Sequence, residues 1–353
     1  MERIATLALQ PNMELAEDVY DYQEKLVLKK DTVLDIHMIK KIQARSVTSV
    51  NIKEPEDYVP TYFEKLKVSK KFSQFEEIYN TNLTAWKVAV DSFIFKKVPM
   101  NHSDLLELVE NITKPFERDK STIIDMLYVL QHSESDMTYA HCLNVALLCK
   151  TFAHWANLSE EQLNTLVLCG FYYDIGKFLL PNDIIWKPGK LNDLEFDLVK
   201  THAFHGYHII KNLDIDEHIK NATLMHHERC DGSGYPQHLE LTAIDPYAKI
   251  IAILDVYEAM TAYRSYRKPL CPFTVIGIIE SESLQKYDAG YIMTFLERMV
   301  EEYMNKQVRL SDGREGVVVF INKQSLSRPM VHCDNNDYVD LSQNRSITIE
   351  ALI

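Results

Sequence analysis

Residues 121–305 constrain the fold most, because they form a succession of amphipathic helical patterns separated by short breaks. Leucine, isoleucine and methionine recur there at helical spacing among glutamate and lysine, which is typical of helices with one apolar face. One helix start is marked by a capping box, since Ser159 is followed three residues later by Gln162. Helices of this kind bury their apolar faces against one another. The pattern predicts a helical bundle as the main domain.

The sequence before the bundle has a different hydrophobic pattern. Residues 1–60 alternate apolar and polar positions, and a helical pattern lies near Asp35–Gln43. This combination predicts a small N-terminal α/β unit, for which a regulatory role is expected. Residues 61–120 have a helical pattern again and are predicted to form a helical connector or the first helices of the main domain.

The sequence after the bundle indicates strands. Residues 306–353 begin with two apolar-containing runs on either side of Asp312-Gly313, which is a hairpin signal, and residues 346–353 form a further strand pattern. A small C-terminal β unit is therefore expected. The predicted fold class is mainly α: a helical bundle over residues 121–305 with small α/β and β units at its two ends.

Composition limits the partners of this chain. It has 38 Lys plus Arg and 51 Asp plus Glu, which gives a net charge of −13. Because phosphates are bound first by positive charge, we expect neither a nucleic-acid polymer nor a membrane surface as partner. An apolar run of about 18 residues, as a membrane helix requires, is absent from the sequence. An anionic substrate would therefore need metal ions or a few well-placed cations.

The N-terminus and the cysteines predict a location. Met1-Glu2-Arg3-Ile4 does not resemble the start of a signal peptide. The six cysteines contain no C-x-x-C pair, and the simplest interpretation is reduced thiols. A cytoplasmic protein is expected.

Histidines and carboxylates recur along the helical stretch. A single one of the 13 histidines is more often a surface or core residue than a ligand, so the arrangement carries the argument. Imidazole and carboxylate together suit Fe, Mn, Zn or Ni. Two such ions about 3.5–4 Å apart can clamp the attacking and leaving oxygens of a phosphodiester. The informative positions are His141, Tyr173-Asp174-Ile175-Gly176-Lys177, His202 with Gly206, His226-His227-Glu228, Asp231–Pro236, and Asp255 with Tyr257–Thr261.

These positions carry a family resemblance. The run His226–Pro236 (HHERCDGSGYP) resembles the signature of the HD-GYP family. Asp174-x-Gly176-Lys177 resembles the end of the family's His-Asp-x-Gly-Lys motif, and His202-x-x-x-Gly206 resembles its third motif. Asp255–Thr261, followed by Arg264-x-x-Arg267, resembles the last. The resemblance covers about half the chain and implies an all-helical HD-type bundle. It also implies hydrolysis of cyclic di-GMP, or in some members cyclic GMP-AMP, at a two- or three-metal centre.

The resemblance also implies roles for individual residues. Asp174 would bridge the metals and, with Lys177, would be catalytic. Lys177 would hold the scissile phosphate as a point charge. Tyr235 would shape the signature loop and position substrate, while Arg264 and Arg267 would contact phosphate or guanine, or else form salt bridges at a helix end. The implied ligands are His202, His226 and His227 for one metal, and His141 and Asp255 for the other.

Tyr173 departs from the family pattern, because it stands where the family has histidine. A phenol must lose a proton with an ordinary pKa of about 10 before it ligates, which a metal such as ferric iron can force. Three outcomes stay open. In the first, Tyr173 is a phenolate ligand. In the second, it does not ligate, and His141, Asp174 and Asp255 hold their metal weakly. In the third, a single metal binds, held by Asp174, His202, His226 and His227.

Two further positions differ from the family. Met137 lies four residues before His141, where members with a third metal carry glutamate, so a trinuclear site is not expected. Glu258 stands where the family usually has aspartate, and it is interpreted as a residue behind the ligands or on the helix surface.

The expected function is a metal-dependent phosphodiesterase that converts a cyclic dinucleotide, cyclic di-GMP first, to a linear dinucleotide or GMP. Its cofactor would be one or two divalent transition-metal ions, with Fe or Mn favoured and Zn or Ni as the other options. One alternative is a degenerate, non-catalytic regulator that binds the cyclic dinucleotide or protein partners of cyclic di-GMP signalling, which Tyr173 supports. Another is a phosphohydrolase for a different nucleotide or phosphodiester. A homodimer stays open, since HD-type domains often self-associate.

Overall fold

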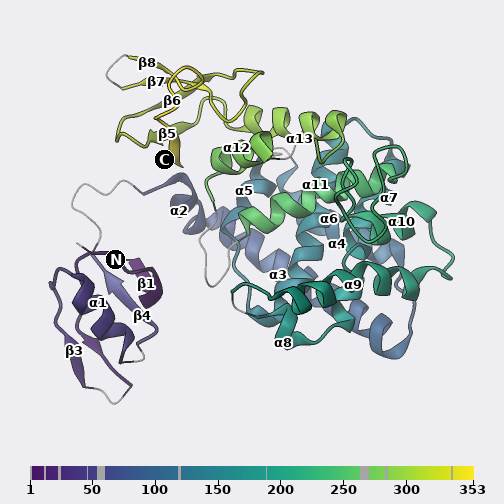
Figure 1. Ribbon diagram of the computed structural model, residues 1–353, viewed down its shortest axis with the longest axis horizontal. Coiled ribbons are helices and arrows are strands. Elements are labelled where there is room, and N and C mark those ends of the chain that lie inside the picture. The colour runs from purple at the N-terminus through teal and green to yellow at the C-terminus, as the bar shows by residue number, and fades with distance from the viewer. Residues whose placement is uncertain are drawn as a thin grey trace. The chain divides into compact units, whose positions relative to one another are not determined.

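A computed structural model describes the chain in two compact units, Met1–Pro60 and Thr61–Ile353 (Figure 1). Among the residues that it describes, no helix has both the length and the apolar character needed to cross a membrane. The six cysteines are free thiols. The described residues are 2–11, 13–22, 25–45, 47–53, 60–117, 121–187, 189–262, 270–282, 285–334 and 337–353.

The N-terminal unit combines the helix α1 and a short 3-10 helix with two short antiparallel strand pairs, drawn in purple in Figure 1. Helix α1 (Ile36–Gln43) begins where the sequence predicts it, because the Asp35 side chain accepts a hydrogen bond from the backbone N–H of Met38. Its apolar side packs into a separate small core that includes Leu15, Leu34 and Ile42. The strand pairs are β1 (Glu2–Ala5) with β4 (Ser49–Ile52) and β2 (Val19–Tyr20) with β3 (Leu26–Leu28), and the short helix η1 spans Thr6–Ala8.

The larger unit is helical, and the predicted mainly-α fold class is confirmed. Its helices before the metal-site motifs are α2 (Tyr62–Lys67), α3 (Lys70–Lys96), α4 (His102–Thr113), η2 (Lys114–Phe116), α5 (Ser121–Val129) and η3 (Glu134–Asp136). The helices that carry or follow the motifs are α6 (Met137–Trp155), α7 (Glu160–Tyr172), η4 (Ile175–Leu179), α8 (Asn182–Ile185), α9 (Asp193–Ile210), α10 (Glu217–Met225), α11 (Pro246–Thr261), α12 (Pro272–Glu282) and α13 (Ala289–Glu302).

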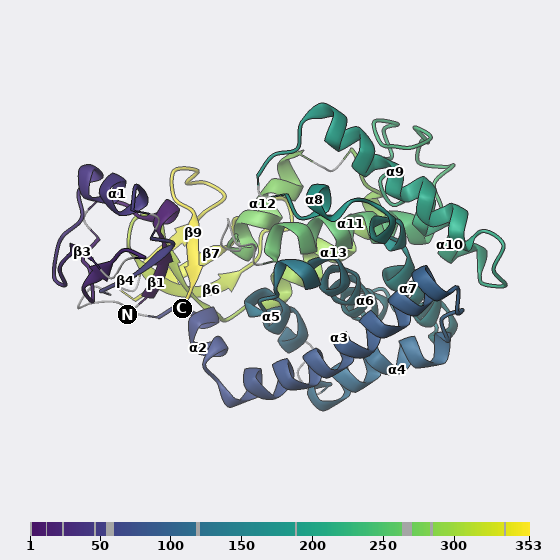
Figure 2. The same cartoon turned by 90° about the horizontal axis from the view of Figure 1, so that it is seen from below.

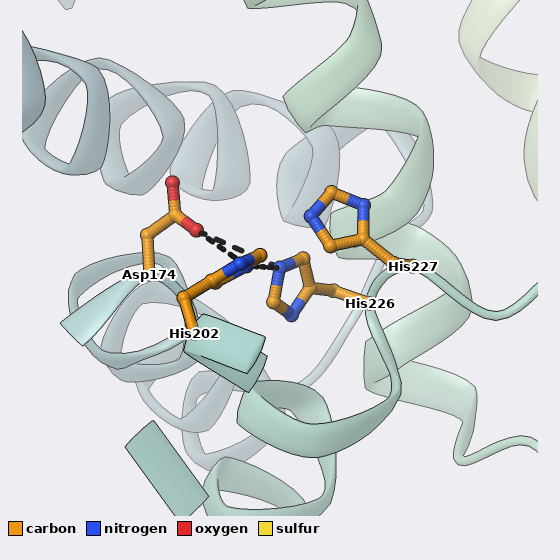
Figure 3. A group of neighbouring side chains, drawn as sticks. All are labelled: Asp174, His202, His226 and His227. Carbon is orange, nitrogen blue, oxygen red and sulfur yellow. Dashed lines mark hydrogen bonds and ion pairs between the residues drawn. The ribbon is translucent and has the colours of Figure 1, made fainter. Parts of the chain in front are cut away.

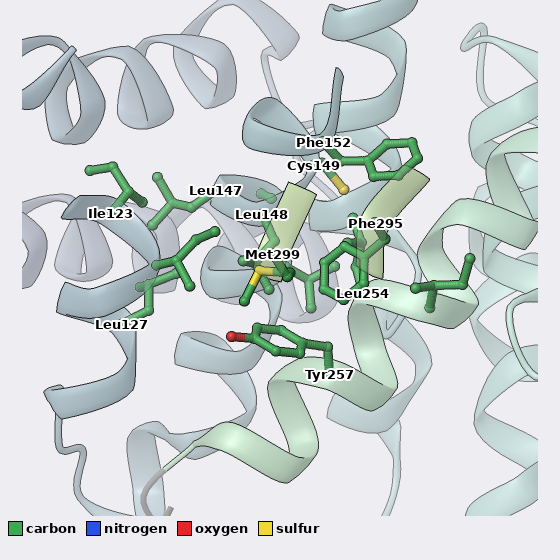
Figure 4. Close-up of a cluster of buried hydrophobic side chains, with 14 of the residues drawn as sticks. Ile123, Leu127, Leu147, Leu148, Cys149, Phe152, Leu254, Tyr257, Phe295 and Met299 are labelled. Carbon is green, nitrogen blue, oxygen red and sulfur yellow. The ribbon is translucent and has the colours of Figure 1, made fainter. Parts of the chain in front are cut away.

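Helix α6 lies at the centre of this unit and packs against α7, α11, α3 and α13. Most of the side chains along α6 are buried. Figure 4 shows two of them, Leu148 and Phe152, among apolar residues of α5, α11 and α13. Segment 61–120, for which a connector is expected, contributes to this core. The Trp86 side chain of α3 is fully buried, and its indole N–H donates to the carbonyl of Tyr139 at 3.1 Å.

The structure describes a five-stranded antiparallel sheet at the C-terminal end, with the order β8-β7-β6-β5-β9. Its last strand, β9, is drawn in yellow in Figure 2. The predicted hairpin is present, since β5 (Gln307–Leu310) pairs with β6 (Glu315–Phe320). The last predicted strand is also present as β9 (Ile349–Leu352), which pairs with β5 and contacts α12. The remaining strands are β7 (Met330–Cys333) and β8 (Tyr338–Asp340).

Candidate metal centre

The predicted ligands come from helices far apart in the sequence. Helix α7 starts at the predicted capping box, in which Ser159 and Gln162 bond reciprocally, and it ends just before Tyr173 and Asp174. Helix α6 supplies His141, α9 supplies His202, and α11 supplies Asp255. His226 and His227 follow the last residue of α10, and Lys177 lies in η4.

A glycine brings the Asp174–Lys177 segment against α9. A Cβ atom at Gly176 would lie 2.0 Å from the carbonyl oxygen of His202 and 2.6 Å from the backbone nitrogen of Gly206. No side chain fits there, so glycine is the residue that permits η4 to touch α9 at this point. This contact places Asp174 and His202 side by side and gives a physical reason for both glycine positions of the motifs.

The first group of ligands surrounds one oxygen of Asp174 (Figure 3). Asp174 Oδ1 lies 3.2 Å from His202 Nε2 and 3.6 Å from His226 Nε2, and the two Nε2 atoms are 3.1 Å apart. His202 Nδ1 faces the carbonyl oxygen of Val199 at 2.6 Å, and His226 Nδ1 faces that of Ala222 at 3.1 Å. Since a carbonyl oxygen only accepts, both rings carry their proton on Nδ1. Both Nε2 atoms therefore present lone pairs.

This convergence of lone pairs fits a metal ion. Asp174 is fully buried, and among the described residues its Oδ1 has no hydrogen-bond partner. Two imidazole lone pairs and a carboxylate oxygen repel one another unless a cation lies between them, and this donor set suits a divalent transition metal. His227 belongs to the same group, whose ligand atoms all lie within 4.8 Å of one another. Burial and the neighbouring His226 and His202 keep the pKa of His227 well below its usual value, so it is a neutral donor.

A second group contains His141, Asp174 and Asp255. His141 Nε2 lies 2.8 Å from Asp255 Oδ1 and 3.6 Å from Asp174 Oδ2, while His141 Nδ1 lies 2.5 Å from Glu258 Oε2. Burial alone would lower the pKa of His141, but the charges of Glu258 and Asp255 outweigh it and raise the pKa to about 9. The imidazole is thus positively charged between carboxylates when no metal neutralises them. Asp174 is common to both groups, as expected of a bridging carboxylate.

Lys177 places a positive charge beside both groups. Its ammonium group forms an ion pair with Asp174 Oδ2. Burial would lower the pKa of Lys177, but the charges of Asp174 and Asp255 raise it above its ordinary value. The lysine therefore keeps its proton next to the candidate metal centre.

Tyr173 is fully buried, and its hydroxyl group donates to Asp255 Oδ1 at 3.3 Å. Burial, followed by the charges of Asp174 and Asp255, raises the pKa of Tyr173 well above its ordinary value. These surroundings favour the neutral phenol over the phenolate. The neutral phenol orients Asp255 through its hydrogen bond.

The signature loop folds back over the histidine pair. Glu228, with 2% of its surface exposed, accepts hydrogen bonds from the backbone N–H groups of Gln237 at 2.7 Å and Leu239 at 2.9 Å. A Cβ atom at Gly234 would lie 2.4 Å from the Cα atom of Glu228, so the loop passes too close for any other residue. The ring of Tyr235 consequently stacks on that of His227, with centroids 4.6 Å apart.

Comparison with known proteins agrees with this geometry. A family model described as HD domain matches residues 116–290. This segment, just under half of the chain, is similar to the HD domain family. The predicted resemblance to HD-GYP proteins is confirmed by its relatives. A cyclic di-GMP phosphodiesterase of Pseudomonas aeruginosa is 30% identical over 233 residues, which are 64% of this chain and 54% of that protein. A 3′3′-cGAMP-specific phosphodiesterase of Vibrio cholerae is 32% identical over 190 residues, which are 52% of this chain and 44% of that protein.

The chain thus spans about half the length of these curated relatives. Among solved structures, an HDG"Y"P protein from Bdellovibrio bacteriovorus matches with a TM-score of 0.52. It is 12% identical, and the match covers 84% of this chain and 99% of that one, which supports the shared HD-type fold.

The larger unit, Thr61–Ile353, brings most of the predicted site residues together. Tyr173 and Tyr235 lie beside the ligand groups, the former bonded to Asp255 and the latter stacked on His227. Arg264 and Arg267 lie outside the described residues. The residues gathered in or next to the two groups are His141, Asp174, Lys177, His202, His226, His227 and Asp255.

The structure decides between the two positions expected for Glu258 and adds a role for Glu228. Glu258 is only 5% exposed, so it does not lie on the helix surface; it lies behind His141, which it bonds, and accepts from the Asn144 amide at 2.8 Å. Its spacing of three residues from Asp255 was an available signal, because residues three apart share a helix face. Glu228 anchors the signature loop, which local sequence pattern does not reveal.

Proposed function

We propose that this HD domain is a metal-dependent phosphodiesterase that hydrolyses a cyclic dinucleotide, cyclic di-GMP or a cyclic GMP-AMP. The observation that carries the proposal is the position of Asp174, whose carboxylate belongs to both ligand groups while Lys177 ion-pairs with it. A phosphodiester needs positive charge around its oxygens, and this acidic chain gathers the means to supply it at one buried point.

The first group would hold one ion through Asp174, His202, His226 and His227, and the second would hold another through His141, Asp174 and Asp255. Fe or Mn is favoured, with Zn or Ni as alternatives. Bound metal ions would polarise the phosphate and lower the pKa of a water molecule towards neutrality, so that this water could supply the attacking oxygen.

The chain's own residues complete the site. Lys177 would hold a non-bridging phosphate oxygen, exchanging part of its ion pair with Asp174 for substrate. Tyr235, stacked on His227, would position the substrate next to the histidine pair. Tyr173 would orient Asp255 through its hydroxyl group and would not ligate. The substrate class is supported by the relatives in P. aeruginosa and V. cholerae, which are named as phosphodiesterases of cyclic dinucleotides.

One observation favours a second candidate function. Tyr173 occupies the position next to Asp174 with a protonated phenol in place of a nitrogen donor, which leaves the second group with three donors. If that group holds no metal, the domain would bind a cyclic dinucleotide, or a protein partner, without cutting it.

Turnover by the full chain tests the proposal. The protein would be purified without chelator, loaded with Fe(II) or Mn(II), and incubated with cyclic di-GMP, 3′3′-cGAMP and 3′,5′-cyclic GMP, with products separated by chromatography. We expect linear dinucleotide or mononucleotide from a cyclic dinucleotide, with loss of turnover in Lys177→Gln and no loss in the exposed control Lys190→Gln. Tight binding of the cyclic dinucleotide without product would support the regulator, and neither binding nor product would refute both.

A further inference from the structure

We propose that a pocket beside Lys177 binds one nucleoside half of the substrate, and that α3 supplies part of it. The inference rests on the proposed function and adds the subsite that would select the substrate. The pocket has a volume of about 300 Å³ and is lined by residues of α3, α6, η4 and α8. That volume is at the lower end for small-molecule sites, which suits one nucleoside better than a whole cyclic dinucleotide.

The pocket and the candidate metal centre are neighbours that share Lys177. This residue lines the pocket and also forms an ion pair with Asp174, which belongs to both ligand groups. A phosphate held by Lys177 would therefore have the metal ligands on one side and this pocket on the other. The nucleoside attached to that phosphate is the part of the substrate within reach of the pocket.

Several aromatic side chains line the pocket. The rings of Tyr139 and Phe178 contact each other with centroids 4.6 Å apart and planes inclined by 45°. Trp186 is half-buried, and Phe95 of α3 leaves 73% of its surface exposed. Exposed aromatic faces around a cavity are the surfaces on which nucleobases stack, whichever base is present.

The charges of the pocket fit an anionic ligand. Lys87 of α3 and Lys177 both line it, and no acidic side chain is found among the described lining residues, although the chain has a net charge of −13. The carboxylates bonded to lining residues are already engaged. Asp136 forms an ion pair with Lys87, and Asp91 accepts a hydrogen bond from the Tyr139 hydroxyl at 2.7 Å.

Helix α3 lies before residue 116, where the match to the HD domain family begins. It is nevertheless fixed to the domain, because Trp86, next to Lys87, is fully buried and donates to the carbonyl of Tyr139. The subsite thus joins a helix from outside the matched segment to the wall of the family's site. Selection among cyclic dinucleotides would then depend partly on residues that the family match does not include.

Two substitutions test the subsite. Trp186→Ala removes a stacking face, and Lys87→Gln removes a charge; their matched controls are Phe320→Ala, an exposed aromatic residue on β6, and Lys96→Gln, an exposed lysine at the end of α3. Binding of cyclic di-GMP and 3′3′-cGAMP by the metal-loaded full chain would be measured by equilibrium dialysis, beside KM, kcat and metal content. Loss of one base stack is expected to raise Kd and KM roughly tenfold or more.

We expect Trp186→Ala to raise Kd and KM with little change in kcat or metal content, Trp186→Phe to restore binding, and both controls to match the wild type. If Trp186→Ala and Lys87→Gln bind like the wild type, the subsite is refuted, while wild-type turnover would leave the phosphodiesterase intact. If the wild type binds a cyclic dinucleotide without turnover, the phosphodiesterase proposal is refuted. The Kd values of the variants from dialysis would then decide whether the subsite exists. Wild-type protein that neither binds nor cuts a cyclic dinucleotide would refute both. Should Trp186→Ala fail to fold, Lys87→Gln with its control carries the same decision.

Discussion

At the scale of single residues, the proposed chemistry depends most on Asp174. It is fully buried, it contributes to both ligand groups, and it forms an ion pair with Lys177. Backbone carbonyls accept hydrogen bonds from Nδ1 of the neighbouring His202 and His226. This keeps both protons on Nδ1 and leaves each Nε2 to face the carboxylate. Such outer contacts fix the tautomer of a metal-binding histidine and raise its basicity.

Glu258 has the corresponding role for His141, and Glu258→Gln tests it. The substitution keeps the shape but removes the charge that faces His141 Nδ1. We expect affinity for the second metal, or turnover, to fall roughly 10- to 100-fold, as when other partners of metal-binding histidines are changed. Metal titration followed by elemental analysis would measure this beside Glu107→Gln, an exposed control on α4. Equal losses in both variants, or no loss in either, would contradict the role.

Tyr173 gives a second prediction at this scale. Because its phenol keeps its proton and donates to Asp255, Tyr173→Phe should leave the number of bound metals unchanged. Tyr173→His should tighten binding at the second group, since it adds a neutral nitrogen donor. Metal content per chain, measured on both variants after identical purification, checks this. Loss of one metal from the phenylalanine variant would mean that Tyr173 is a ligand after all.

At the scale of elements, the site depends on the contact between η4 and α9. Gly176→Ala should disturb it, because the new Cβ atom would meet the carbonyl of His202 at 2.0 Å. Overpacking of this kind costs about 1–3 kcal/mol of unfolding free energy. Metal affinity should fall with it, since the contact aligns Asp174 with His202.

Urea denaturation with metal titration would measure both effects of Gly176→Ala. The control is Gly277→Ala on α12, where the nearest atoms lie 3.4 Å from the added Cβ and no loss is expected. If Gly176→Ala were as stable as the wild type and bound metal as tightly, the close approach would not be what positions Asp174.

The sequence predicted elements better than their contacts. The capping box at Ser159, the helical pattern near Asp35–Gln43 and the Asp312-Gly313 hairpin are local signals, and all three are present. The order of the terminal sheet was not predictable, because the pairing of β9 with β5 joins segments far apart in the chain. The partners of Glu258 were not predictable for the same reason, since His141 and Asn144 lie on another helix.

At the scale of the whole molecule, folding and metal binding should be linked. The unit Thr61–Ile353 contains both ligand groups, whereas Met1–Pro60 has a small core of its own. A ligand that binds only the folded state at a hundredfold above its Kd adds about 2.7 kcal/mol of stability. The buried lone pairs around Asp174 repel one another without a cation, so chelation should lower the melting temperature of the larger unit.

Calorimetry with and without chelator would measure that linkage. We expect chelation to lower the main transition, and Asp174→Asn to melt at one temperature under both conditions. A wild-type transition that does not respond to chelator would mean that the two groups hold no metal in the folded protein.

We propose above that Asp174 joins two metal sites which act on a cyclic dinucleotide. A metal count by elemental analysis and a cyclic di-GMP assay on the same samples of wild type and Asp174→Asn would test this. We expect about two metals per chain with turnover in the wild type, consistent with a two-metal centre, and loss of metal and turnover in Asp174→Asn. Wild-type protein without metal or turnover after Fe(II) or Mn(II) loading would contradict it, as would an Asp174→Asn variant that keeps both.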